Sequence, residues 1–272
     1  MSTGTAAPWW VANPRPAWGA TLARGIGLPA LRVALVAIGA TLAWVLLGVT
    51  AGWMPFPGAP VVTVVAMAPV NILCLWLVAR SLRAEGRRIG DLVGYRAGRL
   101  GRDILWGLLW LVVLAVPFQL TIMAVMWLLH GDGMLAAFET VFFDPNAIPP
   151  YDPAVAFALA VIALVTFVPL NAPAEELLYR GVAQGALARR MPIALAILIP
   201  AVFFGLQHIW YAPTPAAVVV YACAFFVWGA CSGVIAWRQG RLLPLIVAHL
   251  LVNLFLTLPA FAVPFLIANG AA

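Results

Sequence analysis

The chain has 272 residues, of which 65% are hydrophobic and only 9% are charged, and its mean hydropathy is +1.04. A soluble globular domain carries about 25% charged residues, so this composition excludes that class and predicts a polytopic membrane protein. The formal charge of +6 comes from arginines that cluster between apolar runs, which indicates anchoring of membrane segments rather than nucleic-acid binding. Cys74, Cys223 and Cys231 lie inside apolar segments without CxxC spacing, so neither disulfides nor a cysteine metal site is predicted.

The beginning of the chain is rich in tryptophan. Residues 1–25 lack the basic region, apolar core and cleavage site of a secretory signal. Trp9, Trp10 and Trp18 are typical of the headgroup region of a bilayer, where one end of the ring is wet and the other is apolar. We therefore expect a short interfacial arm before the first membrane helix.

Apolar runs dominate the rest of the chain and predict an all-α fold, a polytopic transmembrane helical bundle. Crossing about 30 Å of hydrocarbon takes roughly 20 helical residues. Runs of about this length lie at 33–54, 60–79, 104–129, 154–172, 192–208, 216–237 and 242–258. Residues 80–103 carry seven arginines against three acids, and residues 131–153 carry four acids and no arginine. The first of these loops is therefore expected in the cytoplasm and the second on the opposite face.

The stretch 174–190 leaves two topologies open. If the arginines at 189–190 and 238–241 are all cytoplasmic, residues 154–188 form one long or broken crossing and the chain has seven spans. If residues 171–173 form a tight turn, 174–190 is a span of its own and the chain has eight. The arginine count favours seven, whereas Pro173 favours eight, because proline disturbs a helix at the residue before it.

Four polar residues in the second half of the chain are expected to lie at similar depths. Beyond residue 153 the acids are a single glutamate pair, and two of the three histidines also lie there. The helices that carry Glu175 and His208 would be joined by a tight turn, and each residue lies about 23 to 26 Å from it. Counting from the next turn places His249 and Asn253 at overlapping depths, at about 14 and 20 Å. We therefore expect the four side chains to share a site.

Spacing suggests different roles for the two glutamates. Glu176 and Arg180 are four residues apart with the glutamate first, which favours an ion pair. Glu175 points about 100° away from Glu176, so we expect its carboxylate to stay available. Phe204 and His208 are also four apart, which lets the ring pack beside the imidazole.

An available carboxylate near two imidazoles is a general-base arrangement. Glu175 can take a proton from water, and His249 and Asn253, four apart on one helix face, can hold the oxygen that becomes negative when a carbonyl is attacked. The pattern predicts hydrolysis of an amide by activated water. The alternatives to a catalytic role are structural. Glu176 would form an ion pair, and His208, considered alone, would be a hydrogen-bonded packing residue.

Three short motifs in order resemble those of a known family. EELLYRG from residue 175, FFGLQH ending at 208 and HLLVN from 249 resemble the EExxxR, FxxxH and HxxxN motifs of the CPBP intramembrane proteases. That group contains the Ras-converting CAAX prenyl endopeptidase and the bacterial Abi proteins. The predicted organisation is N-terminal membrane helices and loops without a motif (1–153), a catalytic core (154–258) and a C-terminal tail (259–272), all in one membrane domain.

The resemblance implies that Glu175 and His208 activate the water and that His249 and Asn253 form the oxyanion site. The implied supporting residues are Glu176, Arg180 and Phe204. Family members act near the cytoplasmic side, which favours about eight membrane helices, with seven as the alternative. No cofactor is favoured, because imidazoles from distant helices serve as donors as readily as ligands. Zinc held by Glu175, His208 and His249 is the alternative.

The resemblance also implies the partners. The expected substrate is a membrane-embedded or lipidated peptide or protein in the lipid bilayer, and no nucleic acid is expected. An arginine-only, alanine-rich composition points to a GC-rich bacterial genome, and therefore to a multi-pass protein of the bacterial cytoplasmic (inner) membrane. The alternative function is a non-proteolytic membrane partner or bacteriocin self-immunity protein on the same fold. A transporter with a proton-linked glutamate is a third reading.

Overall fold

The computed structural model describes residues 17–52, 60–143 and 152–268, and every regular element in these ranges is a helix. The expected all-α bundle is thus confirmed. Trp9 and Trp10 of the predicted arm lie outside the described residues. Trp18 begins α1 (Trp18–Leu22), is 50% exposed, and has the Arg190 guanidinium 5.3 Å from its ring centroid.

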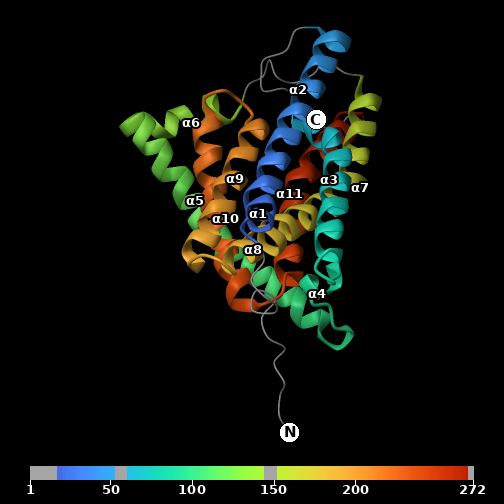
Figure 1. The fold of residues 1–272 in the computed structure, drawn as a ribbon. Helices are drawn as coiled ribbons and strands as arrows, with labels where there is room; N and C mark the ends of the chain where they lie inside the picture. The colour runs from blue at the N-terminus through green and yellow to red at the C-terminus, as the bar shows by residue number, and fades with distance from the viewer. Residues whose placement is uncertain (1–16, 53–59, 144–151, 269–272) are drawn as a thin grey trace.

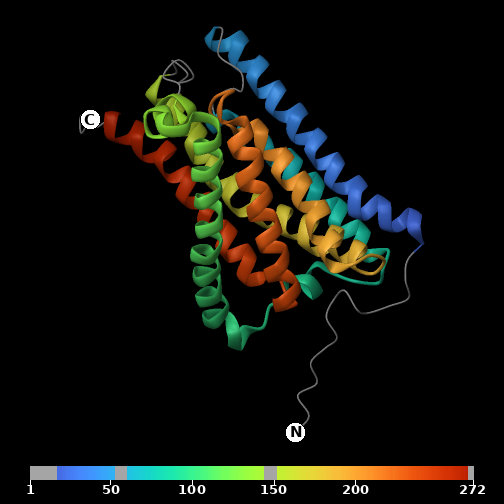
Figure 2. The same ribbon diagram turned by 90° about the vertical axis from the view of Figure 1, so that its left-hand side faces the viewer.

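Seven long helices form the bundle (Figure 1): α2 (Leu28–Ala51), α3 (Pro60–Arg83), α5 (Leu100–His130), α7 (Pro153–Glu175), α9 (Ile193–His208), α10 (Ala217–Gln239) and α11 (Leu243–Ala268) within the described ranges. The shorter helices are η1 (Ala23–Gly27), α4 (Ile89–Val93), η2 (Ala97–Arg99), η3 (Gly131–Gly133), α6 (Met134–Phe142), η5 (Glu176–Ala183), α8 (Gln184–Ala188) and η6 (Ile209–Tyr211). Helix α9 packs beside α10, and α7 lies between α3 and α11. Figure 2 shows α2 and α5 on opposite sides of the bundle.

The turn expected at residues 171–173 does not form. Helix α7 runs through this segment and continues as η5 and α8, so residues 154–188 are one helical stretch. Pro169 and Pro173 are accommodated inside α7, because each removes a single backbone N–H and a helix can bend there without ending. In the described residues six helical stretches are long and apolar enough to cross a membrane, and Leu243–Leu258 is a shorter apolar one. Within the described residues, the continuous stretch 154–188 agrees with the seven-span alternative, and no separate span forms at 174–190.

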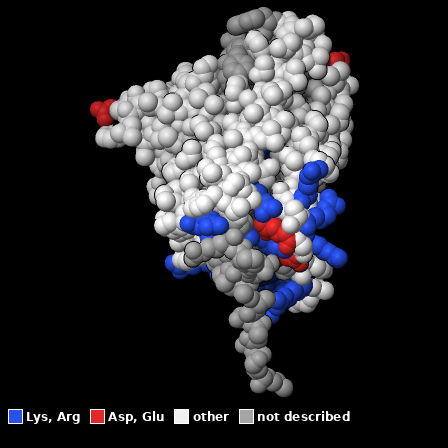
Figure 3. Space-filling model, viewed as in Figure 1, with Lys and Arg blue, Asp and Glu red and all other residues white. Residues whose placement is uncertain are grey.

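Arginine side chains gather at one end of the bundle, and acidic atoms appear at isolated points of the opposite end (Figure 3). Ion pairs join the connections at the arginine end: Arg189 donates to Glu85 at 2.6 Å, and Arg241 lies 2.5 Å from Asp103. The turns after α3, α8 and α10 therefore lie at the same end, as the seven-span topology requires.

The last helix continues into the predicted tail. Helix α11 continues to Ala268, so residues 259–268 extend the last helix, and residues 269–272 lie outside the described part of the chain. The segment LPAFAVPFLIA is as apolar as the helix before it, and its prolines do not end the helix.

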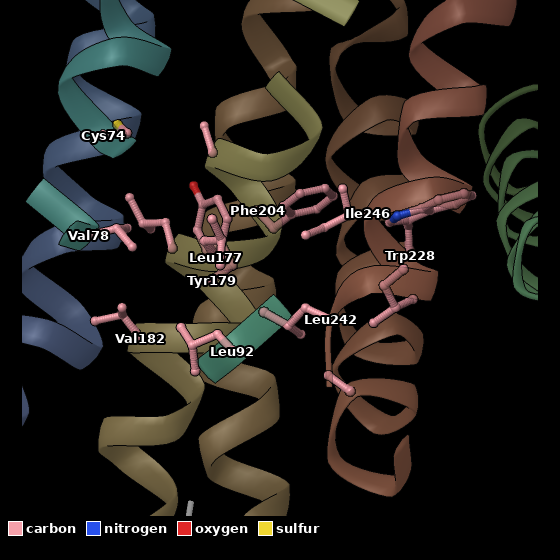
Figure 4. Packing of buried hydrophobic residues seen from close by; sticks show 14 of the residues in the cluster. Cys74, Val78, Leu92, Leu177, Tyr179, Val182, Phe204, Trp228, Leu242 and Ile246 are labelled. Carbon is pink, nitrogen blue, oxygen red and sulfur yellow. The ribbon is translucent and has the colours of Figure 1, made fainter. Parts of the chain in front are cut away.

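Buried apolar side chains from both halves of the chain form one core (Figure 4). The labelled members are Cys74, Val78, Leu92, Leu177, Tyr179, Val182, Phe204, Trp228, Leu242 and Ile246. Close helix approach supports this core: a Cβ on Gly205 would lie 2.6 Å from the carbonyl oxygen of Ala222, so glycine is required where α9 meets α10.

Candidate active site

The glutamate pair lies where the helix changes its geometry. Helix α7 ends at Glu175, and the π-helical segment η5 begins at Glu176. Pro173 supplies no backbone N–H, and the N–H of Glu176 is shared by the carbonyls of Ala172 and Pro173. π-helical turns inside α-helices occur often at functional sites. Every residue of η5 is buried, so this irregular turn lies inside the bundle and carries its polar side chains with it.

Glu175 is held by an arginine from α2. Arg32 is fully buried, and its Nη2 donates to Glu175 Oε1 at 2.8 Å, to Asn71 Oδ1 at 3.0 Å and to Asn171 Oδ1 at 3.1 Å. Its Nε donates to Gln207 Oε1 at 2.9 Å. Four helices, α2, α3, α7 and α9, thus meet at one guanidinium group.

This ion pair corrects the expectation that Glu175 stands without a cationic partner. The arginine takes one carboxylate oxygen, while the other, Oε2, is buried and has no hydrogen-bond partner among the described residues. Arg32 is not among the predicted site residues, because the first predicted span begins at residue 33. A single charge inside LPALRVALV was the available signal, since intramembrane charges are expensive and usually paired.

Glu176 forms the predicted pair with Arg180, at 3.5 Å between Oε1 and Nη1. The arginine also donates to Ser232 Oγ at 2.6 Å, and its guanidinium carbon lies 4.2 Å from the ring centroid of Phe204. His249 Nδ1 lies 2.8 Å from Glu176 Oε1, and because a carboxylate accepts, the imidazole donates. Glu176 therefore orients a histidine as well as neutralising an arginine.

One ring nitrogen of His208 forms a hydrogen bond with the backbone. Its Nδ1 lies 2.6 Å from the carbonyl oxygen of Phe204, which can only accept, so Nδ1 carries the proton and Nε2 is left as an acceptor. The ring stacks on Phe225 with centroids 3.6 Å apart, and lies 4.6 Å from the Phe204 ring, as the spacing predicted. His249 Nε2 is 3.5 Å from Glu175 Oε2.

The four residues expected to share a site line one cavity of about 940 Å³. Glu175, His208, His249 and Asn253 all contribute to its wall. Most of the remaining wall is apolar and comes from α3, α5, α7, α10 and α11. The supporting residues of the three motifs lie behind this wall and do not line it. Predominantly apolar cavities of this size with a few polar groups are typical ligand sites.

The side chains named as alternative zinc ligands do not form a zinc site in the arrangement described. No group of three or more His, Cys, Asp and Glu side chains in the described ranges is arranged to hold a metal ion. Glu175 Oε1 accepts from Arg32, and a cation beside that guanidinium would meet like charge.

One comparison with known proteins gives a match. Residues 155–255 match the family model described as type II CAAX prenyl endopeptidase Rce1-like. No curated protein and no solved structure matches the chain. The matched segment contains the three motifs and all four of the polar residues predicted to share the site. Residues 155–255 are thus similar to this family, and the match supports a CAAX-type protease fold in this part of the chain.

Proposed function

We propose that the protein is an intramembrane endopeptidase that hydrolyses a peptide bond of a membrane-associated peptide or protein, with water activated by Glu175 and His208. The observation that carries the proposal is Glu175 Oε2. This oxygen is buried without a hydrogen-bond partner among the described residues, and Glu175 lines a large, mostly apolar cavity. A carboxylate oxygen without a donor, on a residue that lines such a cavity, would serve as a general base for a bound water.

The proposed reaction begins with a water that donates one hydrogen bond to Glu175 Oε2 and one to His208 Nε2. Glu175 takes a proton as the water oxygen attacks the scissile carbonyl carbon. The resulting oxyanion is held by the Asn253 side-chain amide, whose Nδ2 is buried without a partner among the described residues, and by His249. The C–N bond then breaks, and Glu175 returns its proton to the leaving amine.

Arg32 and Glu176 would hold the catalytic side chains in position. Arg32 anchors Glu175 Oε1, which leaves Oε2 for the attacking water. Glu176 accepts from His249 Nδ1, which leaves Nε2 to act on the substrate.

The cavity favours a substrate with a large apolar part. Its walls are mainly apolar, while the polar side chains that would act on a peptide bond come from α7, α9 and α11. A lipidated peptide or a membrane-embedded segment meets both requirements, because the lipid or apolar side chains would fill the cavity. By the positive-inside rule, the arginine end would face the cytoplasm of a bacterial cell.

Cleavage of defined peptides tests this function. The purified protein in liposomes is incubated with a library of membrane peptides that includes S-prenylated CAAX peptides, and products are identified by mass spectrometry. We expect at least one peptide to be cut, with and without the zinc chelator 1,10-phenanthroline. Absence of cleavage throughout the library would favour a non-proteolytic membrane partner or immunity protein. Loss of cleavage with chelator and its return with zinc would favour a zinc mechanism.

A further inference from the structure

Tyr211 is a polar residue of the cavity that the three motifs do not include. It ends η6, three residues after His208, and lines the cavity with His208 and Glu175. Its ring centroid lies 5.6 Å from that of His208. The hydroxyl oxygen is buried and has no hydrogen-bond partner within the described ranges. By contrast, the buried Tyr179 hydroxyl donates to Gln207 at 2.9 Å.

Tyr211 and Glu175 belong to the wall of the same cavity. The short helix η6 that carries Tyr211 packs against α2, the helix of Arg32. Leaving a buried hydroxyl unpaired destabilises the protein, so a donor in this position is expected to have a partner in the working enzyme.

The hydrogen-bonding groups of these three cavity residues are of complementary kinds. Glu175 Oε2 and His208 Nε2 are acceptors, and the Tyr211 O–H is a donor. A water that gives both protons to the acceptors has two lone pairs, and a hydroxyl donor takes one of them. The remaining lone pair is then the single nucleophilic position, and its direction is set by three side chains.

We propose that Tyr211 is a further catalytic residue, whose hydroxyl donates a hydrogen bond to the attacking water and directs its free lone pair at the scissile carbonyl. This inference rests on the proposed peptide hydrolysis. Tyr211 keeps its proton throughout: Glu175 takes the proton of the water, and the tyrosine stays hydrogen-bonded to the same oxygen in the tetrahedral intermediate. Because the contact is made to water and not to the peptide, its loss lowers kcat and leaves KM nearly unchanged.

The test compares Tyr211→Phe with wild type on a peptide that the wild-type protein cuts in the liposome library. Phenylalanine keeps the ring and removes only the hydroxyl. We expect kcat to fall about 10- to 100-fold, the range for loss of one hydrogen bond in a charged site, with KM within about twofold. The matched control is Tyr95→Phe, which removes a phenol hydroxyl from a side chain that is 57% exposed, and should retain wild-type kinetics.

Two further measurements separate the explanations. A Glu175→Gln variant is assayed beside Tyr211→Phe: if Glu175→Gln stays active, the proposed function fails, whereas an inactive Glu175→Gln with a fully active Tyr211→Phe overturns only the role of Tyr211. Thermal unfolding in detergent is recorded for each variant. Unchanged unfolding with lowered kcat supports the proposal, and a loss of activity that matches the loss of folded protein overturns it.

Discussion

Arg32 and Glu175 lie 143 residues apart in the sequence and form a fully buried ion pair, with 2.8 Å between Nη2 and Oε1. The arginine belongs to the N-terminal part of the chain, which carries no recognisable motif, and the glutamate begins the first motif. The N-terminal helices therefore contribute directly to the candidate site and do not merely surround it.

Arg32→Met should lower the free energy of unfolding by about 3–5 kcal/mol and abolish cleavage, because it leaves the Glu175 carboxylate buried without its cation. In the double variant Arg32→Met/Glu175→Gln both charges are gone, so stability should return towards wild type while cleavage does not. Thermal unfolding in detergent, together with the peptide assay, measures both effects. Arg102→Met, at an exposed position of α5, is the control and should change neither. A double variant as unstable as Arg32→Met would contradict this account.

Close packing of α9 and α10 gives a second prediction. Gly205→Ala places a Cβ 2.6 Å from the carbonyl oxygen of Ala222, so the helices must move apart, and we expect a loss of about 1–3 kcal/mol. Gly48→Ala is the matched control, because no atom of a neighbouring residue lies within 4 Å of its Cβ position. The unfolding temperatures of the two variants in detergent should therefore differ. Equal temperatures would show that α9 and α10 do not approach as described.

The ion cluster at the arginine end gives a pH dependence. Glu85 accepts from Arg189 at 2.6 Å, forms an ion pair with Arg24, and lies 3.4 Å from Arg87. Burial raises the pKa of Glu85, but the hydrogen bond from Arg189 and the charges of the three arginines outweigh it, so the pKa lies below its ordinary value of 4.5. A pKa lowered by folding stabilises the protein above the unfolded value, and this stabilisation is lost as the pH falls through the folded value.

Unfolding temperatures of wild type and Glu85→Gln, recorded against pH, check this prediction. Wild type should be the more stable above about pH 5, and the difference should shrink as the pH falls below the ordinary glutamate pKa. Glu139→Gln, at an exposed position of α6, should follow the wild-type curve throughout. A difference between wild type and Glu85→Gln that grows in acid would contradict the lowered pKa.

The sequence predicted local features better than contacts between distant segments. Hydrophobic runs indicated all seven long helices of the described ranges, although α11 continues beyond the predicted run to Ala268. Four-residue spacing indicated the pairs Glu176 with Arg180 and Phe204 with His208. These features depend on one helix and its period of 3.6 residues. The sharing of one cavity by Glu175 and His208 also followed from counting residues along neighbouring helices.

Features that depend on contacts between distant segments could not be predicted from the local sequence pattern. The sequence around Pro173 is compatible both with the end of a helix and with a bend inside one. Packing of η5 inside the bundle determines that the helix bends and continues. The partner of Glu175 comes from α2, and a pairing over 143 residues has no signature in either segment. Tyr211 resembles an interfacial aromatic in sequence, and only the cavity shows that its hydroxyl is buried beside the site.

The most direct test of the central claim, that Glu175 is the general base, is the rate at which Glu175→Gln cuts a library peptide in liposomes, relative to wild type and to Glu139→Gln. Glutamine keeps the size of the side chain and its ability to accept from Arg32, but it cannot take a proton from water. We predict that Glu175→Gln is slower by about 10²- to 10⁴-fold and that Glu139→Gln equals wild type. A Glu175→Gln variant that cuts at the wild-type rate would contradict it.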